Sequence, residues 1–142
     1  MKKKFIQTLS AILVGASLIS CGTVIKASVV NNSTIVENDE VVKTKEIYYE
    51  ILTSAQKYLY HCDAKDKNAE ALRVWTEHLN EIYNDLFNRL DNSKRSELEK
   101  SQTEWYFKVS EEAKKTSSED EYKAYMAQAT KERCFDLVSK YL

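Results

Sequence analysis

The chain contains no proline, and both of its glycines, Gly15 and Gly22, lie in the N-terminal part of its 142 residues. Tight β-hairpins need residues that adopt a positive φ, usually glycine or asparagine. After Gly22, only the pair of Asp91 and Asn92 has this character. The rest of the chain therefore predicts an all-α domain.

Apolar residues recur at steps of three and four, which is the period of an amphipathic helix. We expect helices over about residues 39–61, 66–90, 93–115 and 118–142. The stripe of the second helix is the clearest and comprises Leu72, Trp75, Leu79, Ile82, Leu86 and Leu90. The expected stripe of the first helix comprises Val42, Ile47, Ile51, Leu52, Ala55 and Leu59. Because short connections favour antiparallel neighbours, the predicted fold is a small up-and-down bundle of three to four helices.

Polar residues mark the starts of the last two helices. Asp91, Asn92 and Ser93 interrupt the apolar pattern, and their short side chains can accept hydrogen bonds from the free amides of a helix start. Ser118 and Glu121 have the spacing of a capping box. We therefore expect one helix to begin near residue 93 and the last at Ser118.

The first 20 residues have the layout of a secretory signal peptide. Three lysines, Lys2, Lys3 and Lys4, precede an uncharged apolar stretch that ends near Ile19. The sequence LISCG, with its cysteine at position 21, resembles a bacterial lipobox, in which the cysteine is acylated and becomes the new N-terminus. We expect a lipoprotein signal peptide over residues 1–20, a lipid on Cys21, a flexible tether over 21–38 and a helical domain over 39–142.

Two other interpretations of the N-terminal segment stay open. Cleavage after Ala27 would release a soluble periplasmic or secreted protein, although Lys26 lies between the recognition positions Ile25 and Ala27. An uncleaved anchor is the second, but the apolar stretch falls short of the roughly 20 apolar residues that cross a bilayer. The lipid-anchored envelope protein is the favoured interpretation.

The charge of the exported chain limits its partners. Loss of residues 1–20 removes three lysines and no acidic residue, so the formal charge of −1 becomes −4. Nucleic-acid binding needs a basic face, and we therefore expect no nucleic-acid partner. A cationic partner is compatible with this charge.

Histidine and cysteine patterns do not point to an enzyme. Only two histidines, His61 and His78, occur, and neither lies in a Glu-x-x-His or His-x-x-x-His arrangement, which would put two ligands on one helical face. His61, Cys62 and Asp63 are adjacent, but adjacent helical residues point in different directions. We expect no catalytic residues, no metal site and no cofactor.

Three polar residues, Gln102, Thr130 and Arg133, fall close to the apolar stripes of their helices. Buried polar groups are costly unless they are paired. We therefore expect these residues to form a set of hydrogen bonds between helices that fixes their register.

The aromatic residues divide into two groups. Trp75, Trp105 and Tyr83 recur at helical spacing with leucines and are expected in the core. In the first helix, tyrosines extend around more than one face, so we expect some of them to be exposed and available for contacts: Tyr48, Tyr49, Tyr58 and Tyr60.

The segment AEALRVWTEHLNEIYNDLFNRL, followed by LEKSQTEW and ATKER, resembles the LprI-like lysozyme-inhibitor family of bacterial envelope proteins. The family pattern is Ala-Glu near a helix start, then Leu-Asn-x-x-Tyr-x-x-Leu, Gln-x-x-Trp and Thr-x-x-Arg. The matching residues are Ala69, Glu70, Leu79, Asn80, Tyr83, Leu86, Gln102, Trp105, Thr130 and Arg133. The resemblance covers about residues 62–142, and we interpret the motif residues as structural.

The chain departs from the family in its cysteines and after Trp105. Members often carry an Arg-Asp pair four residues after the tryptophan, where this chain has Val109 and Ser110. Members also have two local cysteine pairs, which Cys62 and Cys134 cannot form. A Cys62–Cys134 bridge would close a long loop and stabilise the fold by roughly 4 kcal/mol. Against it, Cys134 is expected about 22 Å along the last helix, whereas Cys62 lies at a helix end, so the bridge stays open.

Two functions follow from these observations. The resemblance and the acidic charge imply an envelope protein that binds and inhibits lysozyme, an enzyme that is commonly very basic. The alternative is a non-inhibitory interaction module whose tyrosine-rich first helix binds another envelope protein or a second copy. Charge-steered capture of lysozyme should weaken as salt rises, whereas apolar packing should be nearly indifferent to salt.

Overall fold

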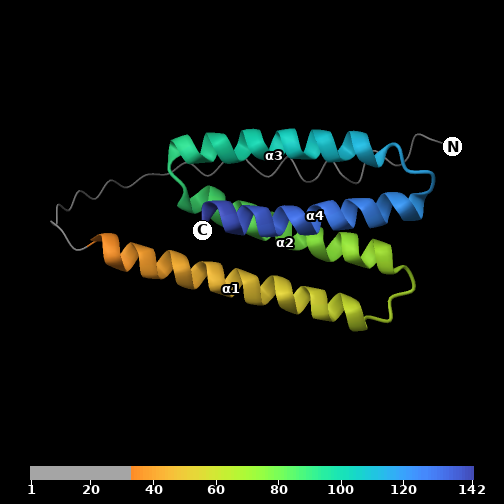
Figure 1. The fold of residues 1–142 in the computed structure, drawn as a ribbon, viewed down its shortest axis with the longest axis horizontal. Helices are drawn as coiled ribbons and strands as arrows, with labels where there is room; N and C mark the ends of the chain where they lie inside the picture. Colours follow the sequence, from red (N-terminus) through yellow and green to blue (C-terminus); the bar gives the residue numbers. More distant parts are fainter. Residues whose placement is uncertain (1–32) are drawn as a thin grey trace, which may run out of the picture. The chain divides into compact units, whose positions relative to one another are not determined.

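The computed structural model describes the backbone of residues 33–142 and the side chains from Asp39 onward. These residues form four helices and no strand, so the all-α prediction is confirmed (Figure 1). The helices are α1 (Ser33–His61), α2 (Lys67–Arg89), α3 (Asn92–Ala113) and α4 (Glu119–Tyr141). Within this part of the chain, no helix is long and apolar enough to cross a membrane. The predicted signal peptide, Cys21 and residues 21–32 of the predicted tether lie outside the described residues.

The helix starts are set by short polar side chains. Asp66 accepts a hydrogen bond from the backbone N–H of Ala69 at 2.9 Å and begins α2. Asp91 accepts from the N–H groups of Ser93 and Lys94 and begins α3. These contacts satisfy amides that have no partner within the helix.

The capping box at α4 differs in one detail from the predicted one. The Ser118 hydroxyl accepts from the N–H of Glu121 at 3.2 Å, as expected. The Glu121 carboxylate, however, accepts from the N–H and hydroxyl of Ser117 rather than from the N–H of Ser118. These hydrogen bonds lower the pKa of Glu121.

Helix α1 begins at Ser33, earlier than the predicted start at residue 39. The residues over 33–38 are helical, although the sequence pattern there lacks an apolar period. They contain neither glycine nor proline, the two residue types that cost a helix most. A helix that is already anchored further along can therefore extend through them.

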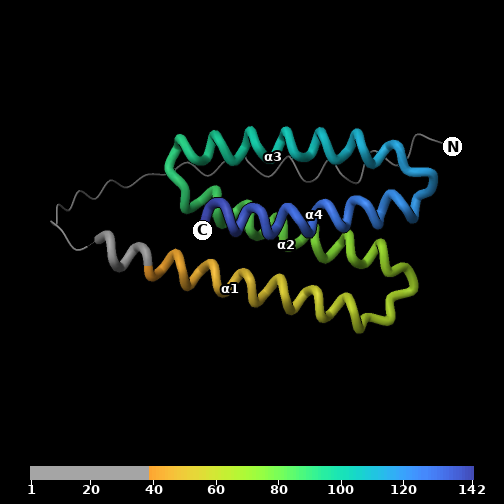
Figure 2. The backbone as a smooth tube through the Cα atoms, viewed as in Figure 1, coloured from red at the N-terminus to blue at the C-terminus, as the bar shows by residue number. Residues whose placement is uncertain are grey.

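Helices α2 and α4 form the centre of the bundle and run in the same direction, while α1 and α3 run in the opposite direction on either side (Figures 1 and 2). At the start of the pair, Lys123 of α4 forms an ion pair with Asp66 at 2.7 Å. Further along, the thiol of Cys134 lies 3.6 Å from the backbone carbonyl oxygen of Trp75. A side chain that reaches the backbone of the next helix implies close approach of the two helices, which small residues permit.

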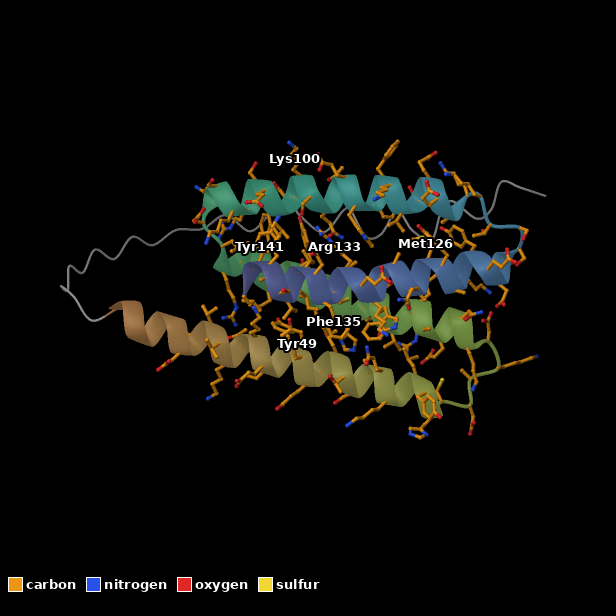
Figure 3. The ribbon with its side chains drawn as sticks, viewed as in Figure 1. Tyr49, Lys100, Met126, Arg133, Phe135 and Tyr141 are labelled. Carbon is orange, nitrogen blue, oxygen red and sulfur yellow. The ribbon has the colours of Figure 1, made fainter. Side chains whose placement is uncertain are left out.

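The core collects apolar side chains from all four helices. Its largest fully buried members are Leu52, Leu79, Ile82, Leu86, Leu98, Met126, Leu137 and Val138. Trp75 is buried as predicted, whereas Trp105 and Tyr83 are partly buried and pack against the core. Between α1 and α4, Tyr49 faces Phe135 with ring centroids 6.1 Å apart (Figure 3).

The predicted core stripe of α1 is partly wrong. Leu52 and Ala55 are buried, but Val42, Ile47 and Ile51 are exposed. As an outer helix of the bundle, α1 buries only the narrow stripe that contacts α2 and α4. Exposed tyrosines on α1 were predicted, and Tyr58 and Tyr60 are exposed.

The two described cysteines are both free. Cys134 is buried between α2 and α4, and this burial raises the pKa of its thiol to about 12. Cys62 follows the end of α1, where its thiol donates a weak hydrogen bond to the carbonyl oxygen of Leu59. The thiols contact different elements of the fold.

Candidate functional site

Among the buried polar side chains of the described residues, the guanidinium of Arg133 on α4 has the most hydrogen-bond partners. Its Nε donates to Oε1 of Gln102 at 3.0 Å, and its Nη2 donates to the hydroxyl of Ser101 at 2.7 Å. Its Nη1 pairs with Oδ2 of Asp136, one turn further along α4, at 2.6 Å. The guanidinium also lies over the ring of Trp105, 5.8 Å from its centroid. Arg133 therefore joins α4 to α3 through the N–H groups of its planar guanidinium, and its side chain extends toward α3 (Figure 3).

The predicted hydrogen-bond set between helices exists in part. Gln102 and Arg133 are joined as expected, and both are buried. Thr130 is buried too, but its hydroxyl donates to the carbonyl oxygen of Met126 within α4, at 2.6 Å. Threonine can satisfy its hydroxyl locally in this way without a partner from another helix.

The sequence pattern did not identify two partners of Arg133. Ser101 precedes Gln102 and so borders the same helix face, while Asp136 has the i,i+3 spacing from Arg133 that permits an ion pair. Serine and aspartate are usually found on helix surfaces. The available signals were the spacing of Asp136 from Arg133 and that of Ser101, which lies three residues after Leu98 and four before Trp105.

Beside this cluster lies an open hollow of about 290 Å³ between α3 and α4, which we call the α3–α4 hollow. Its lining includes Trp105, Lys108, Val109, Tyr125, Glu132 and Asp136, together with Arg133. Tyr125 and Glu132 are exposed, and Asp136 retains 55% exposure of its side chain although it pairs with Arg133. The hollow thus combines the partly buried ring of Trp105, an accessible tyrosine, two accessible carboxylates and the exposed Lys108.

The other motif residues lie on α2, away from this hollow. Leu79 is fully buried in the core, and Asn80 is half-buried. Tyr83 stacks on Phe87 with centroids 6.1 Å apart, and burial raises the pKa of its hydroxyl. These contacts are packing contacts, in keeping with the structural interpretation of the motif.

Glu70, near the start of α2, ties α1 to α2. Its carboxylate accepts from the guanidinium of Arg73 at 2.7 and 3.0 Å and from the hydroxyl of Tyr58 at 2.8 Å. These hydrogen bonds, those from Arg73 first, lower the pKa of Glu70 to about 2. The carboxylate is therefore charged at neutral pH and holds Tyr58 in place.

Side chains suited to bind a metal do not gather in the described part of the chain. Among residues 39–142, no three histidine, cysteine, aspartate or glutamate side chains are grouped so that they could hold an ion. The organised polar features there are hydrogen-bonded helix contacts and the α3–α4 hollow.

The sequence profile of the family described as "Lysozyme inhibitor LprI" matches residues 60–137, which is more than half of the chain. This chain belongs to the LprI family of lysozyme inhibitors. The LprI match spans all of α2 and α3 and most of α4, whereas nearly all of α1 precedes it. Every residue of the Arg133 cluster and of the α3–α4 hollow lies within the LprI match. No curated protein and no solved structure matches the chain.

We expect Arg133 and Gln102 to act as one unit in the stability of this LprI domain. Gln102→Leu should lower the free energy of unfolding by about 1–3 kcal/mol, because it leaves a buried guanidinium donor without a partner. Arg133→Lys should also destabilise, because an ammonium cannot reproduce the fork that reaches Gln102, Ser101 and Asp136. Denaturant unfolding of the single and double variants should give a coupling energy of at least about 0.5 kcal/mol. If the losses in the free energy of unfolding from the two substitutions simply add, Arg133 and Gln102 do not act as one unit.

Proposed function

We propose that this protein is an envelope lipoprotein that binds and inhibits lysozyme, and that the α3–α4 hollow carries the contact. The proposal rests on one observation above all. The hollow is built entirely within the part of the chain that matches the LprI family, and its lining includes the motif residues Trp105 and Arg133. A function common to a family needs a surface that lies within the shared part of the chain.

The negative charge that suits a cationic partner belongs to the whole exported chain, because Lys108 and Arg133 balance the carboxylates in the lining of the hollow. Glu132 and Asp136 present carboxylates to solvent, and the exported chain carries a formal charge of −4 after loss of residues 1–20. Opposite charge raises the association rate with a basic enzyme. Tyr125 and the partly buried Trp105 supply aromatic surface. Tyrosine and tryptophan are among the residues that contribute most to the stability of protein interfaces.

A lysozyme titration with matched variants tests this function. The full-length protein, purified in detergent, should inhibit lysis of cell-wall particles stoichiometrically, and less so as salt rises. Tyr125→Ala and Glu132→Lys should each weaken inhibition about tenfold, as expected for residues at the centre of an interface. Tyr60→Ala and Glu46→Lys make the same chemical changes on α1 and should leave inhibition unchanged. If the substitutions on α1 weaken inhibition as much as those on α4, the α3–α4 hollow is not the contact surface. If the unaltered protein does not inhibit lysozyme, the proposed function is wrong.

The location of the protein in the cell envelope is a separate part of the proposal. We infer that Cys21 carries a lipid, because a basic start and a short apolar stretch lead directly to the LISCG sequence. Such an anchor would hold an inhibitor next to the cell wall that lysozyme attacks. Labelled palmitate should enter the chain in a bacterium with lipoprotein processing and should be lost in Cys21→Ser. Label retained in that variant would contradict the anchor site.

A further inference from the structure

The exposed side of α1 carries an apolar row that the proposed lysozyme contact does not use. Ile47, Ile51, Ser54 and Tyr58 follow one another at steps of four, three and four, so they share one face of the helix. They line an open groove of about 630 Å³ between α1 and α2. Ile47, Ile51 and Tyr58 are 47%, 38% and 51% exposed, which is high for apolar side chains in one row. The α1 side of this groove precedes the LprI match.

Two tyrosine–carboxylate hydrogen bonds hold α1 against α2 at the two ends of the row. Tyr48 donates to Asp85 at 2.8 Å, and Tyr58 donates to Glu70 at 2.8 Å. These bonds fix the register of the antiparallel pair, so that the middle of the row on α1 lies level with Glu77 and His78 on α2. Both residues line the groove.

One pair of opposite charges on α1 spans the middle of this row. Glu50 and Lys57 lie on the outer flank of the row, one on each side of its centre, and both are exposed. They are seven residues apart, or about 10.5 Å along the helix, which is too far for an ion pair with each other. Neither takes part in an ion pair among the described residues. A two-fold axis through the middle of the row would bring Glu50 of one copy to Lys57 of a second copy.

We propose that the α1–α2 groove is a dimerisation surface that binds α1 of a second copy of this chain in antiparallel orientation. Ile47 and Ile51 of each copy would pack against Ser54 and Tyr58 of the other, while Glu50 pairs with Lys57. The pattern is self-complementary, as a two-fold interface requires. The Glu50–Lys57 pairs need the antiparallel direction, because a parallel two-fold pair places this flank of one helix on the opposite side of the interface from the same flank of the other. The dimer is proposed independently of whether the protein inhibits lysozyme.

Cross-linking of the full-length chain in cells tests this dimer. Cys62→Ser removes the half-buried thiol, and Ser54→Cys then places a new thiol close to the two-fold axis. Phe107→Cys, at an exposed apolar position on α3, is the matched control, and the chain without an added cysteine gives the background. After brief oxidation with copper phenanthroline, the dimer fraction on a non-reducing gel should be high for Ser54→Cys and low for the control.

Charge exchange in the Ser54→Cys background tests the orientation. Glu50→Lys and Lys57→Glu should each lower the dimer fraction about fivefold, because each replaces two attractive pairs by two repulsive ones. The double variant Glu50→Lys/Lys57→Glu should restore it, which also shows that the single variants failed through charge rather than misfolding. If the dimer fraction of Ser54→Cys is no higher than that of Phe107→Cys, the α1–α2 groove is not a dimerisation surface. Failure of the double variant to recover would overturn the antiparallel arrangement.

Discussion

The close contact between α2 and α4 is the interaction on which the rest of the bundle depends. Cys134 lies directly against the backbone of Trp75, and Ala127 is buried on the same side of α4. Small residues at these positions let two parallel helices share one core of leucine, isoleucine and valine side chains. Lys123 and Asp66 join the beginnings of the two helices. Helices α1 and α3 then cover the two sides of this pair, and each contributes only one apolar stripe.

The two outer helices are held by different chemistry. Helix α3 has few apolar residues in its stripe, and the guanidinium of Arg133 supplements them with two hydrogen bonds from α4 to Gln102 and Ser101. Helix α1 is held by tyrosine hydroxyls on charged carboxylates of α2, with Leu52 buried beneath them. A buried, satisfied arginine favours a single register of α3 on α4. Trp105, Gln102 and Arg133 thus lie at the α3–α4 contact, and the exposed apolar row lies on α1.

Residue spacing was sufficient to predict the helices, but it did not predict the environment of every side chain. The stripe of α2 is buried apart from Leu72, which is partly buried, because a central helix contacts neighbours over a wide arc. The same period on α1 predicted Val42, Ile47 and Ile51 in the core, yet periodicity cannot tell which of two apolar rows on an outer helix meets its neighbours. The Gln102–Arg133 contact was predictable from two polar residues in apolar stripes. The local bond of Thr130 and the role of Ser101 depend on side-chain geometry that spacing does not contain.

The central claim is that the part shared with the LprI family contacts lysozyme through the α3–α4 hollow, while α1 serves another interface. Hydrogen–deuterium exchange of the full-length protein, with and without saturating lysozyme, tests this most directly. We expect slower exchange over residues 101–112 and 122–136, with residues 39–58 unchanged. Slower exchange confined to α1, or no change in any helix, would contradict it.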